Sequence, residues 1–299
     1  MHKILITGIN GQIGKVLSKK MENDNAEIFG LDVRKEKFSK FKLFNFSLDD
    51  KYQIKKHVKD FKEIDVLIHL ATKIDGEENV LKSTEESINL NVCSTLNLIK
   101  FLPNLKHICF TSTYMVYGKP KKKNIKENHL TDPTDVYGAS KLATEKFLQI
   151  FSQQSHIPVT ILRLMGVYGL EKPHNQAIPS FIKLLATNKK PNIFGDGKIR
   201  RNHIHVNDVV DAILRSIKKK HPGIYNIGGK ESPSNLELIK IINKKMKKNI
   251  LPNFKENDEP QYDFITDITK AKRKLQFYPK MSINDGIEDT IKKFYVNKW

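Results

Sequence analysis

The sequence predicts an α/β fold in which a doubly wound parallel sheet carries helices on both faces. Short apolar runs alternate with longer amphipathic segments over most of the chain, and this alternation is typical of parallel strands joined by crossover helices. The first apolar run, residues 3–6, leads through three glycines into a helical pattern over 15–21. After residue 165 prolines and glycines interrupt the regular pattern, so we expect a smaller C-terminal α/β lobe beside the sheet.

The individual elements follow from two kinds of hydrophobic pattern. Strands buried on both faces are nearly continuous apolar runs, whereas amphipathic helices repeat apolar residues every three or four positions. On these patterns we expect strands at 3–6, 28–32, 65–70, 106–110 and 158–162, helices at 15–21, 83–102 and 138–154, a strand and a helix within 201–218, and a helical packing face at Ile287, Ile291 and Phe294.

The glycine-rich segment after the first strand has the spacing of a phosphate-binding turn. Gly8 allows a sharp turn out of the strand, Gly11 lets the backbone approach phosphates, and Gly14 lets the helix pack on the sheet. The free N–H groups and the positive end of the dipole of the following helix then face the anion. The segment predicts a Rossmann-type fold that binds the pyrophosphate of a dinucleotide.

An acidic residue at the end of the second strand indicates which dinucleotide is bound. Asp32 stands where a carboxylate accepts hydrogen bonds from the adenosine ribose. Its charge repels a 2′-phosphate, so NAD is favoured over NADP. Arg34 and Lys35 follow closely and soften this preference. The alternative is that Asp32 only begins a turn.

This interpretation divides the chain into two regions. We expect residues 1–165 to form the NAD-binding Rossmann domain, completed by about 201–227. The substrate-binding lobe then spans 166–299, mainly 166–200 and 228–299. Ligands of such sheets bind outside the carboxyl ends of the strands, which is where we place this lobe.

Composition narrows the class of protein. The 299 residues, 39% of them hydrophobic, suffice for a large core. No apolar run approaches the roughly 18 residues of a membrane helix, and the first strand begins too early for a signal segment. Cys93 and Cys109 make neither a disulfide framework nor a metal-binding spacing. We therefore expect a cytoplasmic protein that does not bind membranes.

The formal net charge of +19 raises the question of nucleic-acid binding. Lysine carries nearly all of it, on helix positions such as 218–220 and 244–245. Sequence-specific nucleic-acid surfaces depend on arginine forks and stacking aromatic side chains, and we find no motif of that kind. A solvated, lysine-rich surface that attracts anionic substrates is the simpler interpretation, so we expect no nucleic-acid partner.

Three residues beyond position 110 carry the candidate chemistry. Tyr137 and Lys141 are four residues apart, so they share one face of the predicted helix. An ammonium beside a phenol favours the phenolate and moves a tyrosine pKa from about 10 toward neutrality. Tyr137 is then a general base and acid for an alcohol or ketone, and Thr113 supplies a hydroxyl that orients the reacting oxygen. The alternative is a surface tyrosine beside a solvated lysine.

Motifs spread over the whole chain resemble the extended short-chain dehydrogenase/reductases. Within these the sequence is similar to the NAD-dependent epimerase/dehydratase family, typified by UDP-galactose 4-epimerase. The resemblance rests on segments in the same order as in the family: 7–14, Asp32, 69–72, Asn91 with Thr95, 111–118, 137–141, 163–169, 195–197, 201–208, 225–228 and 267–272.

The resemblance implies a role for each matching residue. It assigns the pyrophosphate to Gly8, Gly11, Gln12, Ile13 and Gly14, the adenine ribose to Asp32, the adenine to Phe46, the path to the nicotinamide ribose to Leu70, Ala71 and Thr72 with Lys141, proton transfer to Tyr137, its hydroxyl partner to Thr113, and a substrate phosphate to Arg201. It also implies a homodimer formed by helices around 83–102 and 138–154.

Departures from the family pattern select among its reactions. Members that dehydrate a sugar carry an Asp-Glu pair directly after the position of Thr113, where this chain has Tyr114 and Met115. Without that acid and base we expect no dehydration. Gly166 replaces an asparagine that commonly contacts the diphosphate in nucleotide-sugar epimerases.

The sequence therefore predicts an NAD-dependent nucleotide-sugar epimerase, in first place a 4-epimerase, which acts through a transient keto sugar. The alternatives are an NAD(P)-dependent 4-keto-sugar reductase or sugar dehydrogenase of the same family, and a non-catalytic NAD-binding protein.

His203 and His205 share one face of a strand but lack a third ligand at metal spacing. We expect no metal site.

Overall fold

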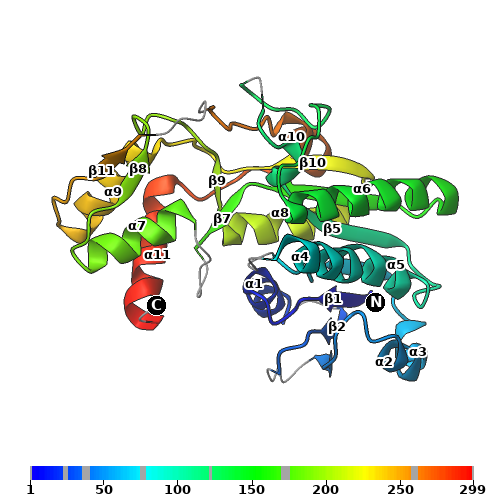
Figure 1. Cartoon of the computed structure of the whole chain (residues 1–299). Helices are drawn as coiled ribbons and strands as arrows, with labels where there is room; N and C mark the ends of the chain where they lie inside the picture. Colours follow the sequence, from blue (N-terminus) through cyan, green and yellow to red (C-terminus); the bar gives the residue numbers. More distant parts are fainter. Residues whose placement is uncertain are drawn as a thin grey trace.

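A parallel sheet forms the centre of the computed structural model, which describes residues 2–22, 26–35, 41–74, 79–120, 123–169, 176–256 and 262–297. Within these residues a seven-stranded sheet has the order β10-β6-β5-β4-β1-β2-β3, and its strand pairs are parallel (Figure 1). The strands are β1 (Lys3–Thr7), β2 (Glu27–Leu31), β3 (Lys42–Phe44), β4 (Val66–His69), β5 (His107–Thr113), β6 (Val159–Leu164) and β10 (Gly223–Ile227). The predicted α/β fold with a parallel sheet is confirmed.

Both faces of the sheet are buried, because successive side chains of each strand enter different hydrophobic clusters. Ile4 and Ile6 of β1 pack in one cluster with α1 (Gln12–Met21), α8 (Val206–Lys219) and α10 (Thr269–Leu275). Leu5, between them, packs in the other cluster. That second face is covered by α2 (Lys51–Lys56), α3 (Val58–Phe61), α5 (Ser94–Ile99) and α6 (Val136–Ser155).

The helix expected over 83–102 is interrupted in the structure. It consists of α4 (Val80–Ser87), the π-helical segment η1 (Ile88–Cys93) and α5. The backbone carbonyl of Asn91, inside η1, accepts hydrogen bonds from the hydroxyls of Thr95 and Thr144, both at 2.9 Å. Side chains that insert into a helical hydrogen-bond ladder distort it locally, so the break lies where this segment contacts α6.

A second group of elements lies beside the sheet, at the left of Figure 1. The helices are α7 (Ala177–Ala186), α9 (Asn235–Met246) and α11 (Ile283–Asn297). They share a hydrophobic cluster in which Ile287 and Ile291 are buried, which confirms the predicted packing face. Two small parallel sheets accompany them, β7 (Gly166–Tyr168) with β9 (His203–His205) and β8 (Asn192–Phe194) with β11 (Asn253–Lys255). The division at residue 165 stays a prediction, although β10 does pair with β6.

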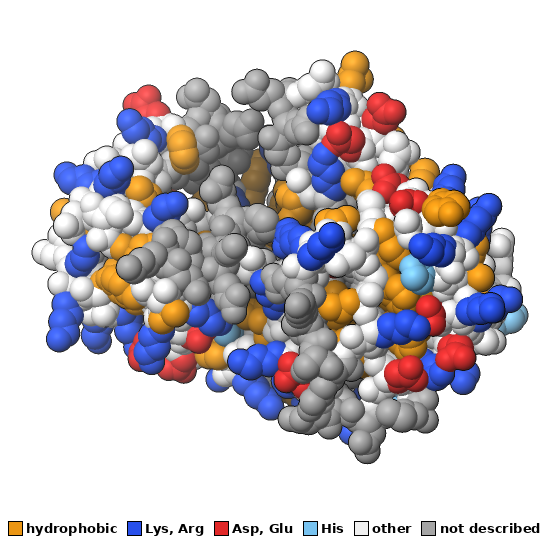
Figure 2. All heavy atoms as spheres, turned by 90° about the horizontal axis from the view of Figure 1, so that it is seen from below, with side chains coloured by type: hydrophobic (Ala, Val, Ile, Leu, Met, Phe, Trp, Pro, Cys, Tyr) orange, Lys and Arg blue, Asp and Glu red, His pale blue; other side chains and the backbone are white. Residues whose placement is uncertain are grey.

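Basic side chains are spread over the surface. Figure 2 shows Lys and Arg side chains over the whole visible face, interspersed with Asp and Glu. No helix in the described part of the chain combines the length and apolar character that a membrane crossing needs. The cytoplasmic location stays a prediction.

Candidate active site

The turn after β1 is built so closely that its glycines leave no room for side chains. Gly8 has a φ of 71°, and a Cβ there would lie 2.8 Å from the backbone nitrogen of Ala71. A Cβ on Gly14 would lie 2.3 Å from the Gly8 carbonyl oxygen. Gly11 begins α1 without a side-chain cap, and the first turn of that helix contains no acidic residue. The turn therefore leaves the positive helix end, with Gln12 and Ile13, to an anion such as a pyrophosphate.

Asp32 lies directly beside this turn. The residue is buried, with 8% of its surface exposed. One carboxylate oxygen accepts a hydrogen bond from the Asn10 backbone N–H and the other from the Arg34 backbone N–H, both at 2.9 Å. These bonds hold the end of β2 against the glycine turn. Each carboxylate oxygen retains acceptor capacity, which is what binding a ribose hydroxyl requires.

The segment that follows β4 passes along the same edge of the sheet. The backbone N–H of Leu70 donates to the Thr7 carbonyl at 3.1 Å, and that of Ala71 donates to the Thr7 hydroxyl at 3.3 Å. Thr72 is exposed at the end of this segment. Phe46 lies on the β3 side, where its ring stacks on His57 with centroids 5.7 Å apart and only 9% of the residue is exposed. The contact with adenine that the resemblance implies stays a prediction, and little of this residue is accessible to make it.

Thr113 and Tyr137 are brought to neighbouring positions. Thr113 ends β5, and its side chain accepts a hydrogen bond from the Met115 backbone N–H in η2 (Tyr114–Tyr117). Tyr137 lies half-buried in the first turn of α6, which is capped by Asp135. A Cβ on the next residue, Gly138, would lie 3.0 Å from the Met115 carbonyl oxygen. The start of α6 thus packs on the segment that follows Thr113.

Lys141 is buried one turn further along α6. Its ammonium nitrogen lies 4.2 Å from the centroid of the Phe110 ring. That ring stacks on His69 at 5.7 Å, and His69 is hydrogen-bonded to the Thr7 hydroxyl at 2.7 Å. Burial lowers the pKa of Lys141 to about 7, against the opposing effect of Glu145. The ammonium therefore lies close to the carboxyl ends of β5, β4 and β1, the edge where the glycine turn begins.

Comparison with known proteins shows which family combines this glycine turn after β1 with the helix that carries Tyr137 and Lys141. Residues 4–228 match the model of the NAD dependent epimerase/dehydratase family. The chain belongs to this family. The predicted family, its NAD cofactor and the class of enzyme, a sugar epimerase or oxidoreductase, are thereby confirmed.

Several proteins of known structure or sequence resemble this chain over most of their length. A UDP-glucuronic acid 4-epimerase from Bacillus cereus, crystallised with UDP-glucuronic acid and NAD, is 28% identical with a TM-score of 0.87, covering 98% of this chain and 99% of that one. A UDP-glucose 4-epimerase from Thermotoga maritima, solved with UDP-glucose, is 25% identical with a TM-score of 0.86, covering 99% and 100%. Human dTDP-D-glucose 4,6-dehydratase is 32% identical over 79% of this chain and 70% of its own.

Asn91 also belongs to the site, although the sequence analysis gave this residue no role. Its side-chain oxygen accepts from the Thr72 hydroxyl at 3.1 Å and from the Lys73 backbone N–H at 2.8 Å. Its amide nitrogen donates to the Ser140 hydroxyl at 2.9 Å. Asn91 thus ties the loop after β4 to the helix that carries Tyr137. A buried asparagine in an amphipathic helix is the signal that could have found it.

Arg201 lies on the other side of the site, exposed and just before β9. Within the described part of the chain, its guanidinium makes no hydrogen bond or ion pair. Its backbone forms a β-bridge with Phe264, whose ring packs on Tyr114 at 5.0 Å. Tyr114 follows Thr113, so this contact connects Arg201 to the end of β5.

The two histidines of β9 have structural partners. His205 forms a hydrogen bond with Asp289 at 2.9 Å through one ring nitrogen and accepts from the Asn207 backbone N–H through the other. Burial, with a contribution from Arg201, lowers the pKa of His203 to about 4. Both rings pack on Tyr168, as expected for side chains on one face. Among the described residues, no group of three His, Cys, Asp or Glu side chains has metal-binding geometry.

Proposed function

We propose that the protein is an NAD-dependent nucleotide-sugar 4-epimerase that acts through a transient keto sugar. The observation that carries the proposal is the position of the buried Lys141 ammonium, over Phe110 and one ring away from the His69–Thr7 hydrogen bond. This contact places the helix that carries Tyr137 beside the glycine turn. A proton-transfer group and a dinucleotide site at one sheet edge are what reversible oxidation of an alcohol needs.

The cofactor contacts are assigned to the residues that build this edge. When bound, NAD supplies reversible acceptance of a hydride from a sugar carbon. The pyrophosphate fits the uncapped start of α1, and Asp32 has acceptor capacity for the adenine ribose. The proposed contacts are Gly8, Gly11, Gln12, Ile13 and Gly14 for the pyrophosphate, Asp32 and Phe46 for the adenosine, and Leu70, Ala71, Thr72, Tyr137 and Lys141 for the nicotinamide side.

Three side chains serve the transfer of the proton of the sugar hydroxyl. Tyr137 removes the proton from the sugar hydroxyl and returns it after the keto sugar has turned in the site. Lys141 favours the phenolate form of Tyr137 when its ammonium is charged. Thr113 holds the reacting oxygen by a hydrogen bond from its hydroxyl. The keto sugar is reduced again within each cycle and the cofactor is regenerated, so no net NADH accumulates.

The proposed substrate class is a sugar carrying a nucleoside diphosphate. Arg201 is exposed, and a guanidinium fork matches phosphate geometry. The relatives solved with UDP-glucuronic acid and UDP-glucose support this class. Tyr114 and Met115 occupy the turn after Thr113 and offer neither a carboxylic acid nor a carboxylate, so elimination of a sugar hydroxyl lacks its catalyst.

The test is incubation of the purified protein with UDP-glucose, UDP-glucuronate and dTDP-glucose, followed by separation of the products and absorbance at 340 nm. We expect a 4-epimer from one of them without net NADH. Net NADH change with a keto or reduced product would instead indicate the reductase or dehydrogenase. Tyr137→Phe is expected to lower turnover by about 10²-fold or more, whereas Tyr278→Phe, an exposed tyrosine, keeps it.

We also propose that two chains associate through α4 and α6. Large apolar side chains are exposed on these two adjacent helices and at the start of η1: Val80, Leu81, Ile88, Phe147 and Ile150. An apolar surface of this kind is typical of a protein interface. Light scattering is expected to give the mass of a dimer, and Phe147→Glu with Ile150→Glu that of a monomer; an unchanged mass would exclude this face.

A further inference from the structure

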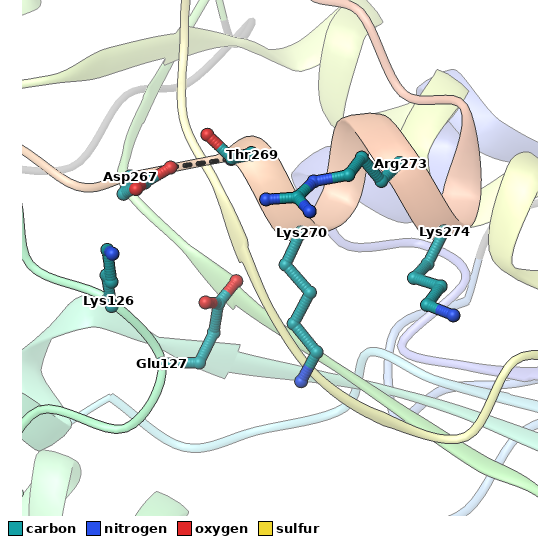
Figure 3. Close-up of a pocket in the computed structure, with 7 residues that line it drawn as sticks. All are labelled: Lys126, Glu127, Asp267, Thr269, Lys270, Arg273 and Lys274. Carbon is teal, nitrogen blue, oxygen red and sulfur yellow. Dashed lines mark hydrogen bonds between the residues drawn. The ribbon is translucent and has the colours of Figure 1, made fainter.

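A cavity of about 270 Å³ lies between α10 and the loop that precedes α6. Figure 3 shows its lining residues, which are Lys126, Glu127, Asp267, Thr269, Lys270, Arg273 and Lys274. The Lys270 ammonium lies over the ring of Tyr225 in β10, at 4.9 Å from its centroid. Since β6, β5 and β4 separate β10 from β1, the cavity is distinct from the glycine turn, and it shares no lining residue with the candidate active site.

Positive charge dominates the lining, with four cations against two carboxylates. The two carboxylates already accept hydrogen bonds from the protein. Asp267 accepts from the Thr269 backbone N–H at 2.7 Å, and Glu127 accepts from the Asn226 backbone N–H at 2.9 Å. In the part of the chain that the structure describes, by contrast, the side chains of Lys126, Arg273 and Lys274 form no ion pair or hydrogen bond.

Two of these cations contribute to lowering the pKa of the Asp267 carboxyl. The hydrogen bonds from Thr269 hold the pKa of its carboxyl below the ordinary value, and Lys126 and Arg273 contribute in the same direction. Figure 3 shows the Asp267 side chain turned toward Thr269, while the Arg273 side chain extends along α10 toward Thr269 and Lys270. An anion entering the cavity therefore meets donors that the protein itself leaves available.

Hydrogen bonds to the sheet, buried or part-buried, fix the backbone around the cavity. The Asn226 side-chain amide donates to the Ile125 carbonyl at 2.9 Å and to the Asp267 carbonyl at 3.4 Å. Arg163 donates to the Glu127 carbonyl at 3.2 Å. These bonds anchor the loop and the start of α10 to the sheet. A ligand then has only side chains to order, and no backbone.

We propose that this cavity binds a small anion bearing one or two phosphate groups, independently of the epimerase reaction. The volume of about 270 Å³ lies just below the range for ligand pockets, which is roughly 300–1,000 Å³, so it suits such an anion better than a dinucleotide. The planar guanidinium of Arg273 matches two phosphate oxygens, and the lysines add charge without fixed geometry.

The test is calorimetric titration of the NAD-saturated protein with inorganic pyrophosphate. Arg273→Ala is expected to weaken the affinity by about tenfold or more, since it removes a bidentate, charge-assisted contact. Lys126→Ala, on the opposite wall, is expected to weaken it in the same direction. Lys272→Ala is the matched control, because Lys272 is exposed on the same helix but does not line the cavity, and we expect less than a twofold change.

Equal affinity of wild type and Arg273→Ala would overturn the proposal, because pyrophosphate would then bind elsewhere, for example at the glycine turn. Equal losses in Arg273→Ala and Lys272→Ala would also overturn it, since they would indicate attraction to the general positive charge. Absence of measurable binding at millimolar pyrophosphate would do the same. Arg273 is exposed, so its removal leaves the fold intact, and thermal unfolding of each variant checks this.

Discussion

Two buried cations lie at the N-terminal half of α6, Lys141 on the helix itself and Arg163 on β6, and their surroundings differ. Arg163 of β6 is 1% exposed and forms a two-pronged ion pair with Glu145, with Nε–Oε1 and Nη2–Oε2 distances of 3.0 and 2.6 Å. Ser112 also donates to Glu145. Lys141 is 2% exposed and, among the described residues, forms no ion pair. Its ammonium contacts the face of the Phe110 ring instead.

The pKa values express this difference. Burial alone would lower the pKa of Arg163, but its bonds to Glu145 more than offset this and raise it. Burial prevails at Lys141 and lowers its pKa to about 7. A buried cation paired with a carboxylate supports the fold, whereas one without an ion-pair partner is typical of a functional site. The comparison predicts that the two residues fail in different ways when they are replaced.

Replacing Arg163 should cause the largest loss of stability. Arg163→Met leaves the Glu145 carboxylate buried and uncompensated, for which we expect a loss of about 3–5 kcal/mol in the free energy of unfolding. Urea denaturation followed by circular dichroism measures it. Arg215→Met is the control, because Arg215 forms a partly exposed pair with Asp211 within α8, and such pairs contribute about 0.3–0.5 kcal/mol. Similar losses in both variants would contradict the structural role of Arg163.

Replacing Lys141 should instead lower activity. Lys141→Met removes the charge that favours the phenolate of Tyr137, and we expect turnover to fall by about 10²-fold, with the protein still folded. The measurement is the rate of sugar epimerisation with saturating NAD. Lys146→Met, an exposed lysine on the same helix, is expected to keep the wild-type rate. Full activity of Lys141→Met would exclude Lys141 from the reaction.

The sequence was sufficient for the part of the site that is local in the chain. Gly8, Gly11 and Gly14 are close neighbours whose spacing alone describes a turn, and the helical spacing of Tyr137 and Lys141 places them on one face. The α/β class followed for the same reason, because each strand and helix carries its own hydrophobic period.

Contacts between residues far apart in the chain could not be predicted from the sequence. The hydrogen bonds of Asn91 to Lys73 and Ser140, and the pairing of Arg163 with Glu145, join residues from different elements. No local pattern encodes which polar side chains meet inside a fold. The π-helical turn at 88–93 was not predicted for the same reason, because its cause lies partly in Thr144 on another helix.

The stability of the protein without NAD should depend on pH through Lys141. Its folded pKa of about 7 lies below the unfolded value of about 10.4. Between these values the unfolded chain binds the extra proton, so stability rises with pH; below pH 7 both states are protonated and the full cost of burying the charge applies. We expect Lys141→Met to be more stable than wild type by about 1–3 kcal/mol at pH 6, with the difference shrinking by pH 9.5. Urea denaturation at both pH values tests this, and a difference that is the same at both would contradict it.

The smallest effect is expected when both partners of the buried ion pair are removed together. In Arg163→Met with Glu145→Leu no unpaired charge remains, and apolar side chains of similar size fill the space between β6 and α6. The Ser112 hydroxyl and the Glu127 carbonyl each lose a partner, so we expect a loss of about 1–2 kcal/mol, well below that of Arg163→Met alone. A double-mutant cycle in urea measures the coupling. If the double variant lost as much as the single ones combined, the coupling energy would be zero, and Arg163 and Glu145 would stabilise this side of α6 independently and not as an ion pair.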